Sequence, residues 1–105
     1  MSFSASTRHV DQNMTILLSG RMGGLDSLDL GRTIAPGFEA TASKVLCVDM
    51  SDVTFIDAAG ITALLQLHRV VAATGGKVKL TGLYGIVKEV CLLCRLDKVM
   101  EIEAS

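Results

Sequence analysis

The sequence predicts an α/β fold with a mainly parallel sheet and about three helices. Three observations lead to this prediction. The chain has 105 residues, which suits a single domain over residues 1–105. Strand-like segments alternate with segments of helical periodicity. After the first two strands, each connection is long enough for the helical crossover that parallel strands need. The expected order is β-β-α-β-α-β-α-β, with an antiparallel hairpin strand at the N-terminus.

The first two strands are expected to form that hairpin. Residues 3–10 alternate loosely between apolar and polar side chains. The turn-forming trio Asp11-Gln12-Asn13 then leads into the apolar segment Met14 to Leu18. Gly23-Gly24 interrupts the strand pattern. These glycines lack the spacing of a phosphate-binding loop and are interpreted as turn residues.

The first helix is expected to follow these glycines. Asp26 or Ser27 can cap its N-terminus. Apolar residues then recur at intervals of four, which indicates one buried face: Leu30, Ile34 and Phe38. Pro36-Gly37 predicts that this helix kinks or ends early.

The middle of the chain carries the strand, loop and helix of greatest interest. The apolar run Val45–Val48, extending to Asp49, is too short for a helix and predicts a strand buried on both faces. Asp57 offers a short oxygen acceptor that can cap the next helix. One face of that helix is predicted to be apolar: Ile61, Leu64, Leu65, Val71 and Ala72. Thr74-Gly75-Gly76 should end it.

The remaining segments complete the fold. Lys77 to Thr81 alternates with period two and predicts a strand with one face in water. The third helix is expected from about Tyr84 to Leu96, with a core-facing stripe of apolar residues: Ile86, Val87, Val90, Leu93 and Cys94. Residues 98–102 should form a short last strand.

Composition excludes several classes of function. Ten basic residues are balanced by eleven acidic ones, and aromatic residues make up only 4% of the chain, so nucleic-acid binding is not expected. No apolar stretch approaches the ~18 residues that a membrane-spanning helix needs. The first residues lack the apolar core of a signal peptide, and the cysteines are odd in number. We expect a reduced, cytoplasmic protein.

The segment from Val48 to Ile61, which contains Asp57-Ala58-Ala59-Gly60, resembles the signature of the STAS domain family, and in particular its anti-sigma-factor antagonists. The resemblance implies a STAS-like single domain in a bacterial, non-enzymatic regulator of transcription by partner switching. Its expected partner is an anti-sigma factor or a histidine-kinase-like serine kinase. The resemblance places the partner-binding surface on the following residues: Asp57, Ala58, Ala59, Gly60, Ile61 and Thr62, with Met22, Gly23 and Gly24 as further candidates.

Two positions depart from the family pattern. Phosphorylatable members carry a serine directly after the motif aspartate, whereas this chain has Ala58, which cannot accept phosphate. Many antagonists carry an acidic residue in place of Gly23. Thr54 and Thr62 could replace the missing acceptor, but we favour the interpretation that Thr54 is a strand-end residue and that Thr62 bonds its own helix backbone.

Two other functions remain as alternatives. A STAS-like accessory subunit of a lipid-transport ATPase, or of a larger signalling assembly, would need no phosphorylatable serine. A small thiol redox protein could use Cys91 and Cys94, although two cysteines late in a helix are more often structural. A zinc site would need ligands from Cys47, His9 or His68, and we expect no metal, no cofactor and no catalytic residue.

Overall fold

The computed structural model describes residues 3–10, 13–24, 29–40 and 44–103. The observed element order confirms the prediction, with one short 3-10 helix added. The elements are β1 (Ser4–Val10), β2 (Asn13–Met22), α1 (Leu30–Ala40), β3 (Val45–Ile56), α2 (Ala58–Ala73), β4 (Lys77–Thr81), α3 (Gly85–Leu93), η2 (Leu96–Lys98) and β5 (Glu101–Ile102). The expected turn trio after β1 and the expected caps Asp26 and Ser27 lie wholly or partly outside the described residues.

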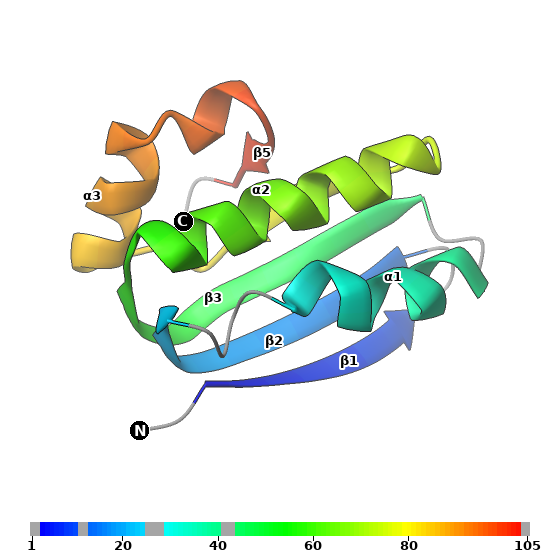
Figure 1. Ribbon diagram of the computed structural model, residues 1–105, viewed down its shortest axis with the longest axis horizontal. Helices are drawn as coiled ribbons and strands as arrows, with labels where there is room; N and C mark the ends of the chain where they lie inside the picture. The colour runs from blue at the N-terminus through cyan, green and yellow to red at the C-terminus, as the bar shows by residue number, and fades with distance from the viewer. Residues whose placement is uncertain (1–2, 11–12, 25–28, 41–43, 104–105) are drawn as a thin grey trace.

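The strands form one mixed sheet in the order β1-β2-β3-β4-β5 (Figure 1). β1 pairs antiparallel with β2, from Ser4 opposite Ser19 to Val10 opposite Asn13. The other neighbouring strands are parallel. The predicted parallel sheet with an antiparallel hairpin strand is therefore confirmed. β3, with 12 residues, lies at the centre of the sheet and leads directly into α2.

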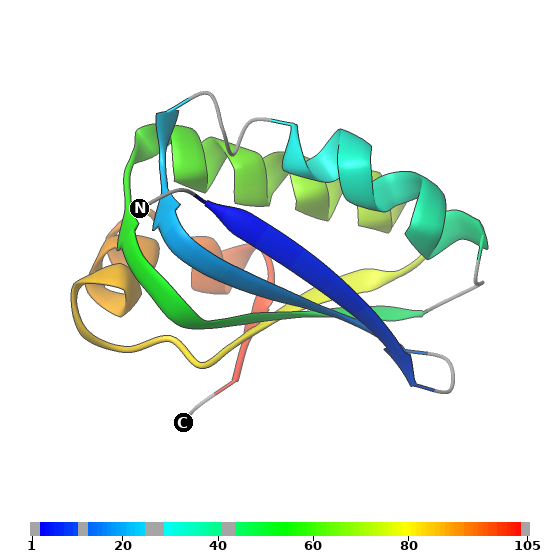
Figure 2. The ribbon, with the colours of Figure 1, turned by 90° about the horizontal axis from the view of Figure 1, so that it is seen from below.

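Helices α1 and α2 both cover the same face of the sheet (Figure 2). The predicted core residues of α1, namely Leu30, Ile34 and Phe38, are buried beneath them. In β3, Leu46 and Val48 are also fully buried, but Cys47 and Asp49 on the opposite face are only half-buried. The prediction that this strand is buried on both faces is therefore wrong, because neither α1 nor α2 covers the second face.

Helix α1 does not end early. It continues through Pro36, which is exposed, to Ala40. Ile34 and Phe38 flank the proline in sequence and are both buried against the core. We attribute the continuation to this packing, which offsets the loss of one backbone hydrogen bond at the proline.

Helix α2 agrees closely with its prediction. It begins after Asp57 and ends at Ala73, with Thr74 as its C-cap and Gly75 at a φ of +85°. Ile61, Leu64 and Val71 are buried and Leu65 is half-buried, but Ala72 is exposed, so its predicted place on the apolar face is wrong. Val78 and Leu80 of β4 are likewise buried, while Lys79 and Thr81 are half-buried, as the alternation predicts.

The orientation of α3 differs from the prediction. Ile86 is 61% exposed and Leu93 is 81% exposed, whereas Val87 and Cys91 are buried. Cys94 is exposed and lies after the last helical residue, so its expected place on the core face is wrong. Arg95, at a φ of +60°, breaks the helix before η2. The last strand is also shorter than expected, because only residues 101–102 pair with β4.

Candidate functional site

The site is centred on Asp57, the residue between β3 and α2. Oδ1 of Asp57 accepts a hydrogen bond from the backbone N–H of Gly60 at 3.1 Å. The carbonyl oxygen of Asp57 accepts the N–H of Ile61 at 2.9 Å. The side chain therefore satisfies one of the N–H groups that a helix leaves free at its first turn, and Asp57 is the N-cap that the sequence predicts.

The end of β2 holds this cap from the other side. The carbonyl oxygen of Met22 accepts the N–H of Asp57 at 3.3 Å. A Cβ on Gly60 would overlap that same carbonyl oxygen and would lie 2.7 Å from Cγ1 of Ile56. Because Gly60 has no side chain, the first turn of α2 can lie directly on the end of β2. The start of α2 is thus fixed by two strands as well as by its cap.

The structure divides the predicted partner-binding residues into two groups. Met22, Gly60 and Ile61 are buried beneath the start of α2. The other predicted residues are exposed or half-buried and lie around the start of α2; we call them the α2 N-terminal surface. They are Gly23, Gly24, Asp57, Ala58, Ala59 and Thr62. Ala58 is exposed, and its methyl group is accessible from solvent.

The two threonines near the site bond to backbone oxygens. Oγ1 of Thr62 donates to the carbonyl oxygen of Ala58 at 2.9 Å, within its own helix, as predicted. Oγ1 of Thr54 donates to the carbonyl oxygen of Gly20 at 3.3 Å, across to β2. Both hydroxyls thus have structural roles.

The family model for the STAS domain matches residues 4–105. The chain belongs to the STAS domain family. This match agrees with the strand order, the antiparallel β1–β2 pair and the three helices described above.

Solved structures of anti-sigma factor antagonists share this fold. The unphosphorylated anti-sigma factor antagonist SpoIIAA matches with a TM-score of 0.73 and 14% identity, over 97% of this chain and 89% of SpoIIAA. An anti-sigma factor antagonist from Mycobacterium paratuberculosis has a TM-score of 0.82 and 17% identity, over 99% of this chain and 87% of its own. A candidate antagonist from Thermotoga maritima has a TM-score of 0.83 and 16% identity, over 96% and 86%. No curated protein sequence gives a significant match.

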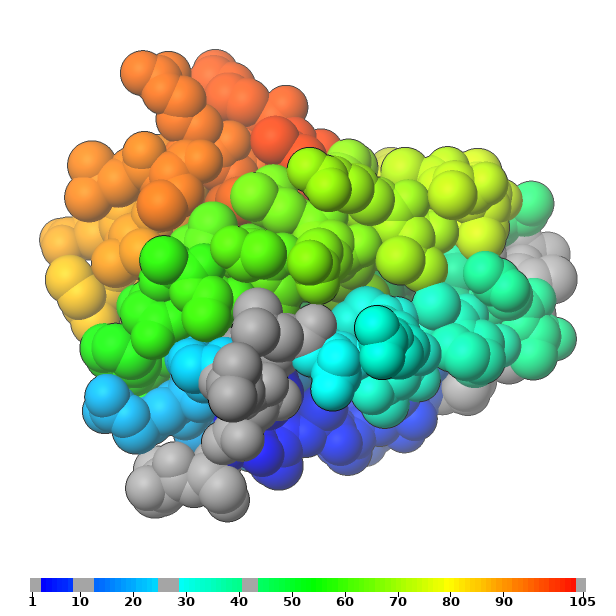
Figure 3. Space-filling model, viewed as in Figure 1, coloured from blue at the N-terminus to red at the C-terminus, as the bar shows by residue number. Residues whose placement is uncertain are grey.

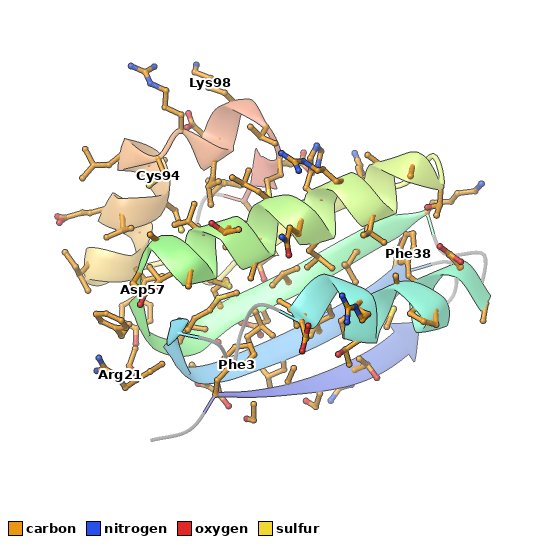
Figure 4. All side chains as sticks on the ribbon, in the orientation of Figure 1. Phe3, Arg21, Phe38, Asp57, Cys94 and Lys98 are labelled. Atoms are coloured by element: carbon orange, nitrogen blue, oxygen red, sulfur yellow. The ribbon has the colours of Figure 1, made fainter. Side chains whose placement is uncertain are left out.

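Near the start of α2, this STAS chain has an arginine–aromatic contact that the sequence did not reveal. The guanidinium of Arg21 lies over the ring of Phe55, with Cζ 4.1 Å from the ring centroid. Figure 4 places Arg21 at the same end of the molecule as Asp57. Arg21 of β2 and Phe55 of β3 are opposite one another in the register of the two strands. Two irregularities in that register precede the pair. The register could have revealed the pair, but these shifts cannot be read from the sequence.

Cys91 of this STAS chain does not have the environment of an activated thiol. Cys91 is buried, and its burial, with a smaller contribution from the neighbouring Cys94, raises its pKa from 9.0 to about 11. A raised pKa lowers the thiolate fraction, which is the reverse of what a nucleophilic cysteine needs. Cys47 is half-buried in β3, and Cys94 is exposed. The residues that the structure describes contain no cluster of three metal-ligating side chains.

His68 lies in α2, away from the α2 N-terminal surface. It is half-buried, and its Nδ1 atom has no hydrogen-bond partner. It borders a cavity of about 330 Å³ that is also lined by residues of β4, η2 and β5. The lining of this cavity contains two basic and two acidic groups, so it has no charge preference: Lys77, Lys98, Asp97 and Glu101.

Among the described helices, none is both long and apolar enough to cross a bilayer.

Proposed function

We propose that this STAS protein is a non-enzymatic regulatory module that acts as an anti-sigma-factor antagonist. As a single domain over residues 1–105, it would bind an anti-sigma factor, or a histidine-kinase-like serine kinase, through the α2 N-terminal surface. The observation that carries this proposal is the exposed Ala58 directly after the Asp57 cap. The likeness in fold to the antagonists SpoIIAA and that of Mycobacterium paratuberculosis supports it.

The chemistry of the surface suits protein binding. Ala58 presents only a methyl group, and Ala59 is a second small apolar residue beside it. A partner that covers these methyl groups removes little polar surface from water, so the desolvation cost is small. The contacts of Met22 with Asp57 and Gly60 hold the surface in one conformation. A preformed surface loses less conformational entropy when it binds.

The same residues would make binding independent of phosphorylation at position 58. SpoIIAA has been solved in an unphosphorylated and a phosphorylated form. A phosphate carries about −1.5 to −2 charge at pH 7, and an interface that buries such a group without a counter-charge is strongly disfavoured. Ala58 has no hydroxyl group that could receive a phosphate. We infer an antagonist that stays competent to bind without this switch.

The test is a pull-down from the native cell, followed by titration of the captured anti-sigma factor or kinase after its identification by mass spectrometry. Ala58→Glu places a buried charge in the interface and should reduce affinity at least tenfold. Ala72→Glu is the matched control, because Ala72 is also an exposed alanine of α2 but lies near its other end. Equal affinity of the wild type and Ala58→Glu would overturn the proposed surface.

A second function is favoured by the absence of hydroxyls at both Ala58 and Ala59. A STAS accessory subunit of a lipid-transport ATPase, or of a larger signalling assembly, would need no phosphate acceptor. The same pull-down separates these functions, because it would capture a transport ATPase in place of an anti-sigma factor. Both functions place the protein in the cytoplasm of a bacterium, and the free state of Cys47, Cys91 and Cys94 favours a reducing compartment.

A further inference from the structure

Helix α3 has apolar side chains on two sides. Its nine residues, Gly85–Leu93, include only two charged ones, Lys88 and Glu89. Val87 and Cys91, four residues apart, are buried against the core. A second set of apolar residues lies along the helix at intervals of four and three, and we call it the α3 seam: Ile86, Val90 and Leu93. Residues at these intervals share one side of a helix.

Two of the three residues of the α3 seam are open to solvent, whereas Val90 packs partly against the core. Ile86 is 61% exposed and Leu93 is 81% exposed, while Val90 is half-buried. Tyr84, directly before the helix, is 56% exposed. A surface helix usually keeps its apolar residues on the one stripe that faces the core. Contiguous apolar surface beyond that stripe is characteristic of an interaction site.

The seam lies at the same end of the molecule as the α2 N-terminal surface. Figures 1 and 2 both place α3 beside the end of β3, the strand that leads into α2. In the space-filling view, the atoms of α3 adjoin those of the first turn of α2 (Figure 3). A standard interface covers about 800 Å² on each partner, a patch about 30 Å across. The whole protein measures 33 × 26 × 21 Å, so a partner bound to the α2 N-terminal surface also reaches α3.

We propose that the α3 seam is the apolar half of the same partner's footprint, and that it receives an apolar helix stripe of the anti-sigma factor. This inference rests on the proposed function. The geometry favours a helical stripe because residues at intervals of four and three form a narrow stripe along the helix, and each side chain of such a stripe can insert between four residues of a facing helix. The small residues of the α2 N-terminal surface would then let the partner approach closely, and the α3 seam would contribute apolar area that becomes buried on binding.

The exposed area argues against a second copy of this chain as the occupant. The exposed parts of Tyr84, Ile86 and Leu93 amount to roughly 400 Å², within the range of the largest apolar patch on a typical monomer. A stable dimer needs about 800 Å² from each copy. The seam alone is therefore too small for a dimer interface, but it is large enough to be the centre of an interface that also covers the start of α2.

The test is a titration of the purified anti-sigma factor with single-residue variants of this protein. Leu93→Lys and Ile86→Lys should each weaken binding at least tenfold, because both place a charge in the apolar centre of the interface. Leu92→Lys is the matched control: Leu92 is an adjacent leucine, 43% exposed, on the other side of the same helix. It should bind within threefold of the wild type. Circular dichroism of each variant checks that the fold is intact.

The possible outcomes separate the two proposals. If the wild type binds, Ala58→Glu does not, and Leu93→Lys and Ile86→Lys bind like the wild type, only the inference on α3 is overturned. If the wild type binds no anti-sigma factor, the proposed function fails and the inference fails with it. Light scattering supplies a further check, since a wild-type dimer that Leu93→Lys separates into monomers would identify a second copy as the occupant and overturn the inference.

Discussion

The carboxylate of Asp57 lies directly against Gly23. A Cβ on Gly23 would lie 2.5 Å from Oδ2 and 3.0 Å from Oδ1 of Asp57, both shorter than ordinary van der Waals contact. Oδ1 is the atom that accepts the Gly60 N–H. The absence of a side chain at Gly23 therefore leaves room for the cap of α2. An acidic residue, which many antagonists of the family carry at this position, would place a second carboxyl group against Asp57.

Replacing Gly23 should weaken the cap. Gly23→Ala would displace the Asp57 carboxylate and should lower the free energy of unfolding by about 1 kcal/mol, the usual contribution of an N-cap. Gly23→Asp should lower it further, because two negative charges would then lie in contact. Urea unfolding followed by circular dichroism measures both changes.

A double-mutant cycle provides the control for this prediction. In an Asp57→Ala background, no carboxylate remains for the new methyl group to displace. Gly23→Ala should then cost much less than it does in the wild type. An equal cost in both backgrounds would contradict the role of the Gly23–Asp57 contact in holding the cap.

Gly60→Ala should destabilise the protein even though alanine is the better helix former. Helix propensity alone favours alanine by about 1 kcal/mol. The new Cβ would, however, overlap the carbonyl oxygen of Met22 and approach Cγ1 of Ile56. Backbone atoms cannot move aside as the end of a flexible side chain can. We expect a net loss of about 1–3 kcal/mol in the free energy of unfolding, as for other overpacked sites.

Gly31→Ala is the matched control for Gly60→Ala. Gly31 is also a buried glycine within a helix, in α1, but its Cβ would lie 3.5 Å from the nearest atom, the backbone N of Leu67. That is an ordinary contact. Gly31→Ala should therefore leave stability unchanged or raise it by up to about 1 kcal/mol. Comparable losses for the two variants would show that steric overlap at Met22 is not the cause.

The parts of the fold that sequence could predict depend on local interactions. The Asp57 cap, the start of α2 and its end at Thr74 follow from residues adjacent in the chain, whose hydrogen bonds form within one or two turns. The same is true of the Thr62 hydroxyl, which bonds one turn back in its own helix. The residues of the candidate site were named from the resemblance to the STAS family, and their use by a partner stays a prediction.

The parts that could not be predicted depend on tertiary packing. Helical periodicity correctly placed Val87 of α3 on the core face, but it missed Cys91 and wrongly placed Leu93 there. The continuation of α1 past Pro36 depends on core contacts that the local sequence does not contain. The burial of Met22 likewise follows from the pairing of β2 with β3.

The thiol groups should differ strongly in reactivity. With a chromogenic disulfide reagent at pH 8, Cys94 should react fast because it is exposed, whereas Cys91 should react only after unfolding. Peptide mapping by mass spectrometry assigns the modified residue. Rapid modification of Cys91 in the folded protein would contradict its assignment as a core residue and would revive the thiol redox alternative.

Stability should fall at alkaline pH in part because of Cys91. Its pKa is raised from 9.0 to about 11 by burial, so the folded protein retains a proton that the unfolded chain releases. Its contribution to stability is fully present below pH 9 and is lost as pH rises toward 11, with a slope of at most about 1.4 kcal/mol per pH unit. Cys91→Val removes this group, so the decrease in the free energy of unfolding between pH 9 and 11 should be smaller in that variant. Equal decreases would contradict the prediction.

Ala58→Ser should restore a phosphate acceptor without disturbing the fold. Residue 58 is exposed at the first position of α2, where a hydroxyl remains solvated, so the free energy of unfolding should change by less than about 0.5 kcal/mol. With the partner kinase and ATP, the wild type should gain no phosphate at this position, and Ala58→Ser should gain one, as mass spectrometry would detect.

The phosphate on Ala58→Ser would lie at the positive end of the α2 dipole, which favours it in the free protein. Against the partner it has no such compensation, so the phosphorylated variant should bind more weakly than its unmodified form. Phosphorylation that leaves the affinity unchanged would contradict the placement of Ala58 inside the interface.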